Sequence, residues 1–95
     1  MRDTAYATEL ATASIPIGEN EARIERIRVK ETGDDEIRFS WWRNGKMMPR
    51  PLDVPEDQLL HMFRAAMQQR VFSERFLLDL IRMLVTSRER ESQSF

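Results

Sequence analysis

Apolar and polar residues alternate along two short segments in the first half of the chain. In residues 26–30 (Arg-Ile-Arg-Val-Lys) the odd positions are apolar, and in residues 37–42 (Ile-Arg-Phe-Ser-Trp-Trp) they are apolar again. Alternation with a period of two is typical of a β-strand with one buried face. Thr32, Gly33 and Asp34 form a glycine-containing loop between the two segments, so we expect a β-hairpin.

The register of this hairpin is expected to keep the two apolar faces together, which requires paired residue numbers with an even sum. With Val29 opposite Ile37, Arg28 lies opposite Arg38, and a slip by two residues places Lys30 against Arg38 instead. Either register sets two cations directly across from each other, which destabilises a sheet unless an anion neutralises them. The pattern favours an anion-binding outer face, and the alternative is a charged face solvated by water and salt.

We expect this outer face to bind DNA, because a two-stranded ribbon fits the major groove and its side chains can reach base edges there. Arg28 and Arg38 are the strongest candidates for contacts with bases or phosphates. Trp41 shares its phase with Phe39 and is expected in the core, whereas Trp42 points outward. The predicted DNA-binding residues are Arg26, Arg28, Lys30, Arg38, Ser40, Trp42, Arg43, Lys46 and Arg50.

Turn and linker signals follow the hairpin. Asn44-Gly45 is a strong turn signal, which either ends the strand or starts a short return. Pro49 and Pro51 break regular strand pairing, so residues 47–52 are expected to form an extended linker.

Two helices are predicted after this linker. Asp53 is a candidate N-cap for a first helix, which is expected to run to about Arg70 with apolar residues at helical spacing. Ser73 is a candidate N-cap for a second helix, which is expected to end near Ser87.

The second helix is apolar on more than one face, which requires burial nearly all round. A hairpin and one partner helix cannot cover it in a small core, so we expect a second copy of the chain to do so. The predicted dimer-interface residues are Phe76, Leu77, Leu80, Ile81 and Leu84. The predicted fold is therefore α+β, a β-hairpin followed by two helices (ββαα), in an intertwined homodimer.

Composition sets the expected boundaries. Residues 1–20 are rich in Ala, Thr and Ser without apolar periodicity, so we expect a flexible arm, followed by a domain over 21–88 and a flexible polar tail over 89–95. The net charge is −1, but residues 22–50 hold eight Lys or Arg against five acids. The chain has no cysteine, no membrane-spanning apolar run and no apolar stretch like a signal peptide, which fits a cytoplasmic protein.

Residues for catalysis are scarce. His61 is the single histidine, and it falls between apolar residues of the first predicted helix. No cluster of Cys, His and carboxylates has metal-ligand spacing, and the three glycines form no phosphate-binding loop. We therefore expect no catalytic residues, no metal and no cofactor.

Two stretches resemble the ribbon-helix-helix repressors, which are dimers with an exposed strand pair in the DNA major groove. Residues 52–59 (Leu-Asp-Val-Pro-Glu-Asp-Gln-Leu) and 73–77 (Ser-Glu-Arg-Phe-Leu) are similar to that family's helix entry and second-helix cap. The chain departs from the family in having Pro49 and Pro51 before the helix and an extra hairpin. This resemblance implies a dimeric DNA-binding regulator.

A second resemblance is to the positive-cofactor family of transcriptional coactivators, which bind single-stranded DNA as dimers. Residues 37–38, 41–42, 44–46 (Asn-Gly-Lys) and 55–60 (Pro-Glu-Asp-Gln-Leu-Leu) follow the order of that family's last strands and helix. The family's glycine- and lysine-rich loop is absent here. The sequence thus predicts a small dimeric DNA-binding regulator of transcription with duplex as the favoured ligand and single strands as a possible one; the alternative is a non-enzymatic protein-interaction adaptor.

Overall fold

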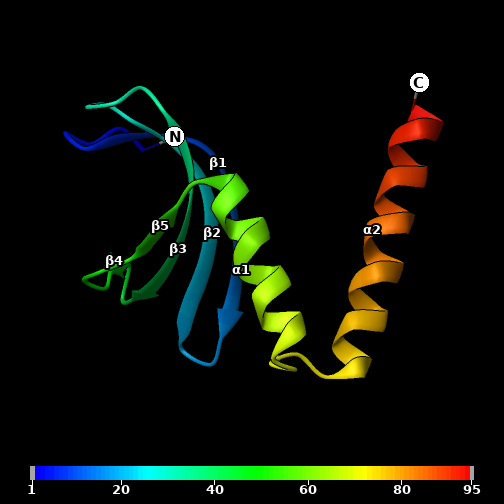
Figure 1. Ribbon diagram of the computed structural model, residues 1–95. Coiled ribbons are helices and arrows are strands. Elements are labelled where there is room, and N and C mark those ends of the chain that lie inside the picture. Colours follow the sequence, from blue (N-terminus) through cyan, green and yellow to red (C-terminus); the bar gives the residue numbers. More distant parts are fainter. Residues whose placement is uncertain (1, 95) are drawn as a thin grey trace. The chain divides into compact units, whose positions relative to one another are not determined.

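The computed structural model describes the backbone of residues 2–94 and the side chains of residues 2–87. An antiparallel five-stranded sheet is followed along the chain by two helices, so the predicted α+β class is confirmed (Figure 1). The elements are β1 (Ala7–Ile17), β2 (Asn20–Val29), β3 (Asp35–Arg43), β4 (Lys46–Met47), β5 (Leu52–Val54), α1 (Glu56–Gln68) and α2 (Glu74–Ser94). The chain divides into two compact units between His61 and Met62, and each is described by itself.

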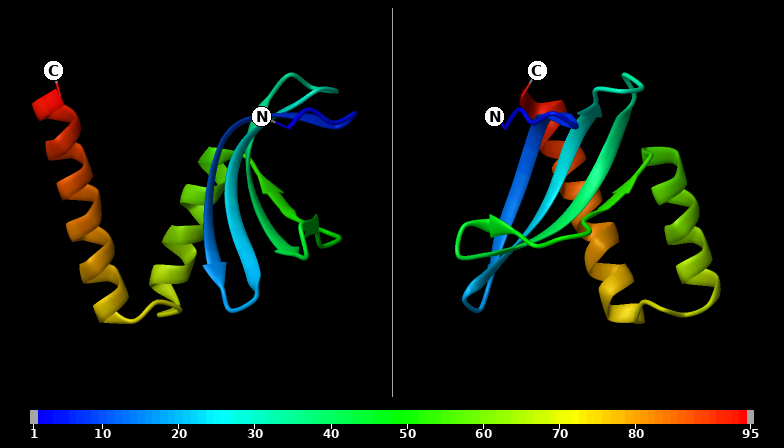
Figure 2. Two further views of the ribbon diagram at one scale, coloured as in Figure 1. Left: turned by 180° about the vertical axis from the view of Figure 1, so that it is seen from behind. Right: turned by 90° about the vertical axis from the view of Figure 1, so that its left-hand side faces the viewer.

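The three long strands lie side by side in the order β1-β2-β3, with β1 at the edge of the sheet (Figure 2). On its other side β3 pairs with β4 at one end and with β5 further along. The predicted hairpin exists as β2 and β3, but it forms the middle of a wider sheet.

The prediction of a flexible arm over residues 1–20 is wrong, because every residue of β1 except Leu10 pairs with β2. Ala7 at its start is buried against Ile27 and Val29 in the main apolar cluster of the sheet. The polar residues of β1 obscured its pattern in the sequence, since most of them lie opposite polar residues of β2 and leave neither face of the strand apolar along its whole length. Sheet pairing satisfies the backbone groups that we expected to be solvated.

A β-bulge at Leu10 interrupts the pairing of β1 with β2, between Glu9 and Ala11. A bulge adds one residue to one strand and so shifts the alternation of its side chains. Glu9 before the bulge and Thr12 after it therefore point to the same side of the sheet, where the Thr12 hydroxyl donates a hydrogen bond to Glu9.

The predicted register of the hairpin is also wrong. Paired residues in β2 and β3 have an odd sum, so Arg28 lies opposite Asp35 and Glu25 lies opposite Arg38. Opposite charges meet across the strands in place of the two facing cations that we predicted. This register is favourable for the charges, and it buries Ile27 and Val29 of β2 beside Ala7 of β1.

The odd register gives the sheet two distinct faces. The polar face carries the apolar cluster of Ala7, Ile27 and Val29 at one end. Beyond this cluster it carries charged and hydroxyl side chains and one indole, namely Glu9, Thr12, Ser14, Glu21, Arg23, Glu25, Arg38, Ser40, Trp42 and Asp53. The groove face carries mainly apolar side chains, namely Ala13, Ile15, Ala22, Ile24, Phe39, Trp41 and Leu52, with Arg26, Arg28 and Asp35 toward one end.

The turn predicted at Asn44-Gly45 is confirmed, with positive φ angles of 51° and 76° that suit a tight hairpin. The predicted linker over residues 47–52 is partly strand, because β4 and β5 occupy its two ends. Asp53 does not cap a helix: it lies in β5 opposite Arg38, and α1 begins at Glu56. An ion pair across the strands has displaced the capping role suggested by its spacing.

Ser73 is confirmed as the cap of α2, because its Oγ accepts a hydrogen bond from the backbone N of Phe76 at 3.1 Å. The helix continues to Ser94, so the prediction of a flexible tail over residues 89–95 is wrong for the part that the structure describes, and Phe95 lies outside it. Arg, Glu and Gln dominate this last stretch, and their high helix propensity accounts for the extension.

Candidate binding surface

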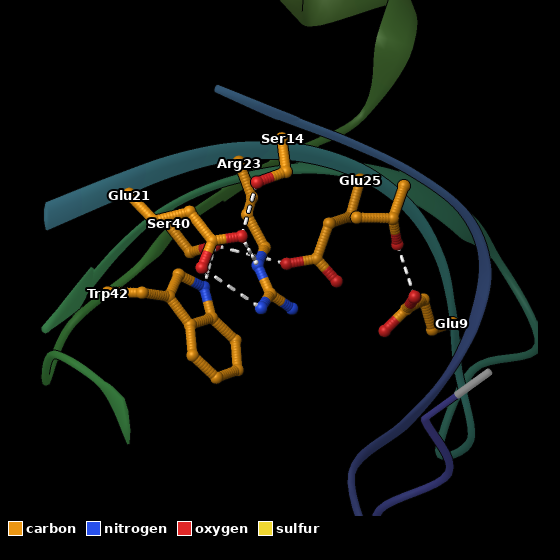
Figure 3. A network of polar contacts seen from close by, with 8 residues as sticks. Glu9, Ser14, Glu21, Arg23, Glu25, Ser40 and Trp42 are labelled. Carbon is orange, nitrogen blue, oxygen red and sulfur yellow. Dashed lines mark hydrogen bonds and ion pairs between the residues drawn. The ribbon is translucent and has the colours of Figure 1, made fainter. Parts of the chain in front are cut away.

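A hydrogen-bonded network fills the concave side of the sheet on its polar face (Figure 3). The indole Nε1 of Trp42 donates to Ser40 Oγ at 2.9 Å, and Ser40 Oγ donates to Glu25 Oε1 at 3.0 Å. Glu25 is only 1% exposed, and Ser40 and Trp42 are buried with it. A buried carboxylate needs hydrogen bonds to stay in place, so this chain of contacts is structural.

Arg23 covers the ring of Trp42, with its guanidinium carbon 3.7 Å from the ring centroid. Its Nε donates to Glu21 Oε2 at 2.8 Å, and Ser14 also donates to this carboxylate. The hydrogen bond from Arg23 lowers the pKa of the Glu21 carboxyl below its ordinary value. The indole that we predicted to face outward is therefore enclosed by a cation and its acidic partner.

Arg38 is held on the same face by two parallel hydrogen bonds to Asp53, from Nε at 2.7 Å and from Nη2 at 2.9 Å. The Arg38 side chain is 9% exposed. A bidentate pair of this kind is among the stronger hydrogen-bonded contacts in proteins. Arg38 thus links β3 to β5 and is enclosed by the protein.

On the groove face, Arg26 and Arg28 share Asp35. Arg28 Nε lies 2.8 Å from Asp35 Oδ1, and Arg26 lies 3.5 Å from Asp35 and 2.5 Å from Glu56. The hydrogen bond from Arg28 lowers the pKa of Asp35. These two arginines are neutralised by acids of their own chain.

Lys30 follows β2 and lies 2.7 Å from Asp3, whose pKa it lowers by a hydrogen bond. Asp3 also accepts a hydrogen bond from Thr8. Asp3, which precedes β1, thus neutralises Lys30, one of the cations that we predicted to bind DNA.

The nine predicted DNA-binding residues therefore do not share one surface. Six of them divide between two faces and the end of β2, and each of these is engaged within the chain: Arg26, Arg28, Lys30, Arg38, Ser40 and Trp42. The remaining three, Arg43, Lys46 and Arg50, are exposed and form no ion pair with any residue whose side chain the structure describes.

An apolar groove of about 520 Å³ runs across the groove face. Strands β1, β2 and β3 form its floor, and residues 48–52 form one wall. Trp41 lines it and is 37% exposed, so our prediction that Trp41 lies in the core is wrong. We correctly predicted that the two tryptophans point to opposite faces of the sheet. Trp42 is the buried one, however, and Trp41 is the exposed one.

Three exposed cations lie at the end of the sheet where β3 turns into β4, and one of them lines the groove. Arg43 lies two residues beyond Trp41 on β3 and so points to the same side, and Lys46 is its partner across the turn. Arg50 lines the groove itself, between Pro49 and Pro51, with a φ of 64°. A left-handed arginine between two prolines is strained, and such strain is found more often at functional sites than elsewhere.

The α2 residues that we predicted to form a dimer interface differ in their solvent exposure. Leu77 and Leu80 are half-buried, whereas Phe76, Ile81 and Leu84 are 45%, 57% and 58% exposed. Within the second unit Phe72 packs between Phe63 and Phe76, with ring centroids 5.6 and 5.0 Å apart. One side of α2 is thus joined to α1 by aromatic contacts, and much of its remaining apolar surface is uncovered in the single chain.

Neither helix, over the residues that the structure describes, is long and apolar enough to cross a membrane. Within the same residues no three His, Asp or Glu side chains gather as a metal-binding group. Comparison with family models, with curated proteins and with solved structures finds no match to this chain. The two resemblances drawn from the sequence stay predictions.

Proposed function

We propose that the protein is a non-enzymatic nucleic-acid-binding protein that binds through the groove face, at the end where β3 turns into β4. The observation that carries this proposal is the exposed indole of Trp41 in an apolar groove beside Arg43, Lys46 and Arg50. The binding surface thus moves away from the hairpin ribbon predicted from the sequence.

Aromatic side chains in an apolar groove suit unpaired bases, which stack on them with little regard to sequence. Trp41 presents such a ring, and Phe39 lines the same groove on the same strand. A base in a duplex is already stacked on its neighbours and cannot use these rings without being displaced. The geometry therefore supports single-stranded nucleic acid more than the duplex that the sequence pattern favoured.

Phosphates need cations that are not already neutralised. The arginines that we predicted to bind DNA on the hairpin are paired with acids of the same chain, as Arg28 is with Asp35. Arg43, Lys46 and Arg50 are exposed and form no such pair among the described side chains. They are the cations that could release counterions from a nucleic-acid backbone.

Self-association remains part of the proposal. The exposed apolar side chains of α2, including Ile81 and Leu84, would be covered by a second copy of the chain. A dimeric binding protein without catalytic residues suits a role in regulating transcription. The adaptor alternative predicted from the sequence would instead use the same groove for a protein partner.

A fluorescence titration with labelled single-stranded and duplex DNA, at several salt concentrations, tests this function. We expect single strands to bind with an affinity that falls steeply as salt rises. Trp41→Ala should weaken binding by about 1–3 kcal/mol, which is the usual contribution of one base stacked on an aromatic ring. Lys46→Ala should weaken binding to all sequences and lower the salt slope by about 1.

Arg28→Ala is the matched control, because Arg28 is exposed yet paired with Asp35 and lies away from Trp41. It should bind single strands as the wild type does. Equal losses in Arg28→Ala and Lys46→Ala would instead indicate a diffuse charge effect. No binding to either form of DNA at low salt would refute the proposal and favour the adaptor.

A further inference from the structure

The outer edge of β1 is a long, almost uncharged strand edge. β1 is the outermost strand of the sheet, and Glu9 is the single charged residue among its eleven. Residues 11–17 of β1 are all exposed. Exposed strand edges in proteins usually carry charges, because an uncharged edge pairs readily with another strand.

The backbone groups that β1 directs outward can be assigned from the pairing. Val29 N donates to Asp34 O, toward β3, so alternation along β2 directs the backbone groups of Ile24 and Arg26 toward β1. Their partners Ala13 and Ala11 use their own backbone groups on β2. Thr12 and Ser14 therefore direct their N–H and C=O groups away from the sheet.

Neither end of this edge is free to pair with a further strand. At the start of β1, Glu9 N donates to Arg2 O at 2.8 Å, and the bulge at Leu10 follows. At the other end Pro16 has no N–H to donate, and proline is a common way to end pairing at an edge. The open stretch is therefore residues 11–15 (Ala-Thr-Ala-Ser-Ile), which is centred on Ala13.

We propose that this stretch pairs antiparallel with the same stretch of a second copy, about a two-fold axis at Ala13. Thr12 then exchanges backbone hydrogen bonds with Ser14 of the second copy, and Ala13 lies opposite Ala13. On the groove face Ala11 meets Ile15 of the second copy. No charges oppose each other, and hydroxyl and apolar side chains each meet their own kind.

Residues 11–15 can therefore pair with the same residues of a second copy, because the stretch is uncharged and the pairing about Ala13 is symmetric. Ala13 and Ile15 also line the groove, so the grooves of the two copies would meet across the axis as one longer apolar surface. The proposal does not depend on nucleic-acid binding. It also concerns a contact separate from any made by α2.

A cysteine introduced at the axis tests this contact, because the chain contains no native cysteine. Residues opposite each other at a non-hydrogen-bonded position have Cα atoms about 4.5 Å apart, within the range of a disulfide. Ala13→Cys in the full chain should form a disulfide-linked dimer under mild oxidation. Glu31→Cys, an exposed site in the loop after β2, is the control and should stay monomeric on a denaturing gel.

The register gives a second test. Ala11→Cys mixed with Ile15→Cys should yield the mixed disulfide in preference to either homodimer. Equal linkage of Ala13→Cys and Glu31→Cys would show random collision and overturn the proposal. An unlinked Ala13→Cys would also overturn it, and would leave the edge to a strand of another protein.

A charge exchange tests the contact without a covalent bond. Ala13→Lys and Ala13→Asp each place two like charges at the axis, and each should raise the dissociation constant of the edge contact by about tenfold. Mixing the two variants should restore association as the heterodimer, read by native mass spectrometry. Ala13 is exposed, so both variants should fold, which circular dichroism checks. An assembly that is identical in both variants and in the wild type would contradict the proposal.

Discussion

Trp41 and Trp42 are adjacent in the chain, yet one is 37% exposed on the groove face and the other is 7% exposed on the polar face. The two indoles therefore report on different surfaces of the same strand. Trp42 Nε1 is bonded to Ser40, and its ring lies under Arg23, whereas Trp41 is open to a ligand.

This difference predicts the fluorescence of two single-tryptophan variants. In Trp42→Phe the remaining Trp41 should be quenched readily by acrylamide, because solvent reaches its ring. In Trp41→Phe the remaining Trp42 should be quenched less, with emission at shorter wavelength. Addition of single-stranded DNA should change the emission of Trp41 alone, and equal quenching in both variants would contradict the assignment of faces.

Arg38→Ala should destabilise the fold and not merely weaken binding. Removal of this side chain leaves the partly enclosed Asp53 carboxylate without its two hydrogen bonds, and breaking a buried pair on one side costs about 3–5 kcal/mol. Urea unfolding followed by circular dichroism measures the loss. Arg28→Ala, which breaks an exposed pair, is the control and should change the midpoint little.

Deletion of residues 2–17 should abolish cooperative unfolding. The deletion removes Ala7 from its cluster with Ile27 and Val29, and it exposes the backbone edge of β2. Thermal unfolding monitored by circular dichroism checks this. A truncated chain with the same melting temperature as the full chain would show that β1 contributes little to stability.

Acid should destabilise the fold through the exposed ion pairs. The pKa of Asp35 is lowered in the folded state by Arg28, so the folded state binds fewer protons than the unfolded state near the ordinary pKa of 3.8. Stability from this pair is therefore fully present above about pH 4 and is lost as the pH falls through the folded pKa. Melting temperatures between pH 7 and pH 2.5 measure the effect.

Asp35→Asn should show a smaller loss of melting temperature over this range, because the variant has no such carboxylate to protonate. Asp34→Asn is the matched control, since Asp34 forms no ion pair with the side chains that the structure describes. Identical pH profiles for Asp35→Asn and the wild type would exclude this pair as a source of acid sensitivity.

Local signals predicted the local structure well. The Asn44-Gly45 turn and the cap at Ser73 follow from the conformational preferences of single residues, and both are confirmed. The α+β class and the alternation along β3 are confirmed as well. These features depend on residues close together in the chain.

The face that is buried could not be deduced from two strands alone. Our register joined the apolar residues of β2 and β3, whereas in the protein Ile27 and Val29 of β2 join Ala7 of β1 instead. The choice depends on a third strand whose polar residues concealed it. The candidate groove was missed for the same reason, because its β3 residues Phe39 and Trp41 are ones that we expected to be covered by the rest of the core.

The bulge at Leu10 gives β1 one residue more than its pairing with β2 requires. Glu9 and Thr12 lie on the polar face only because one extra residue stands between the two halves of the strand. Deletion of Leu10 would place Ala11 directly after Glu9, and every pair with β2 would be kept, with Thr12 and Ser14 still on the polar face. Leu10 is therefore a spare residue of the sheet, and β1 could lose it without turning over either half of the strand.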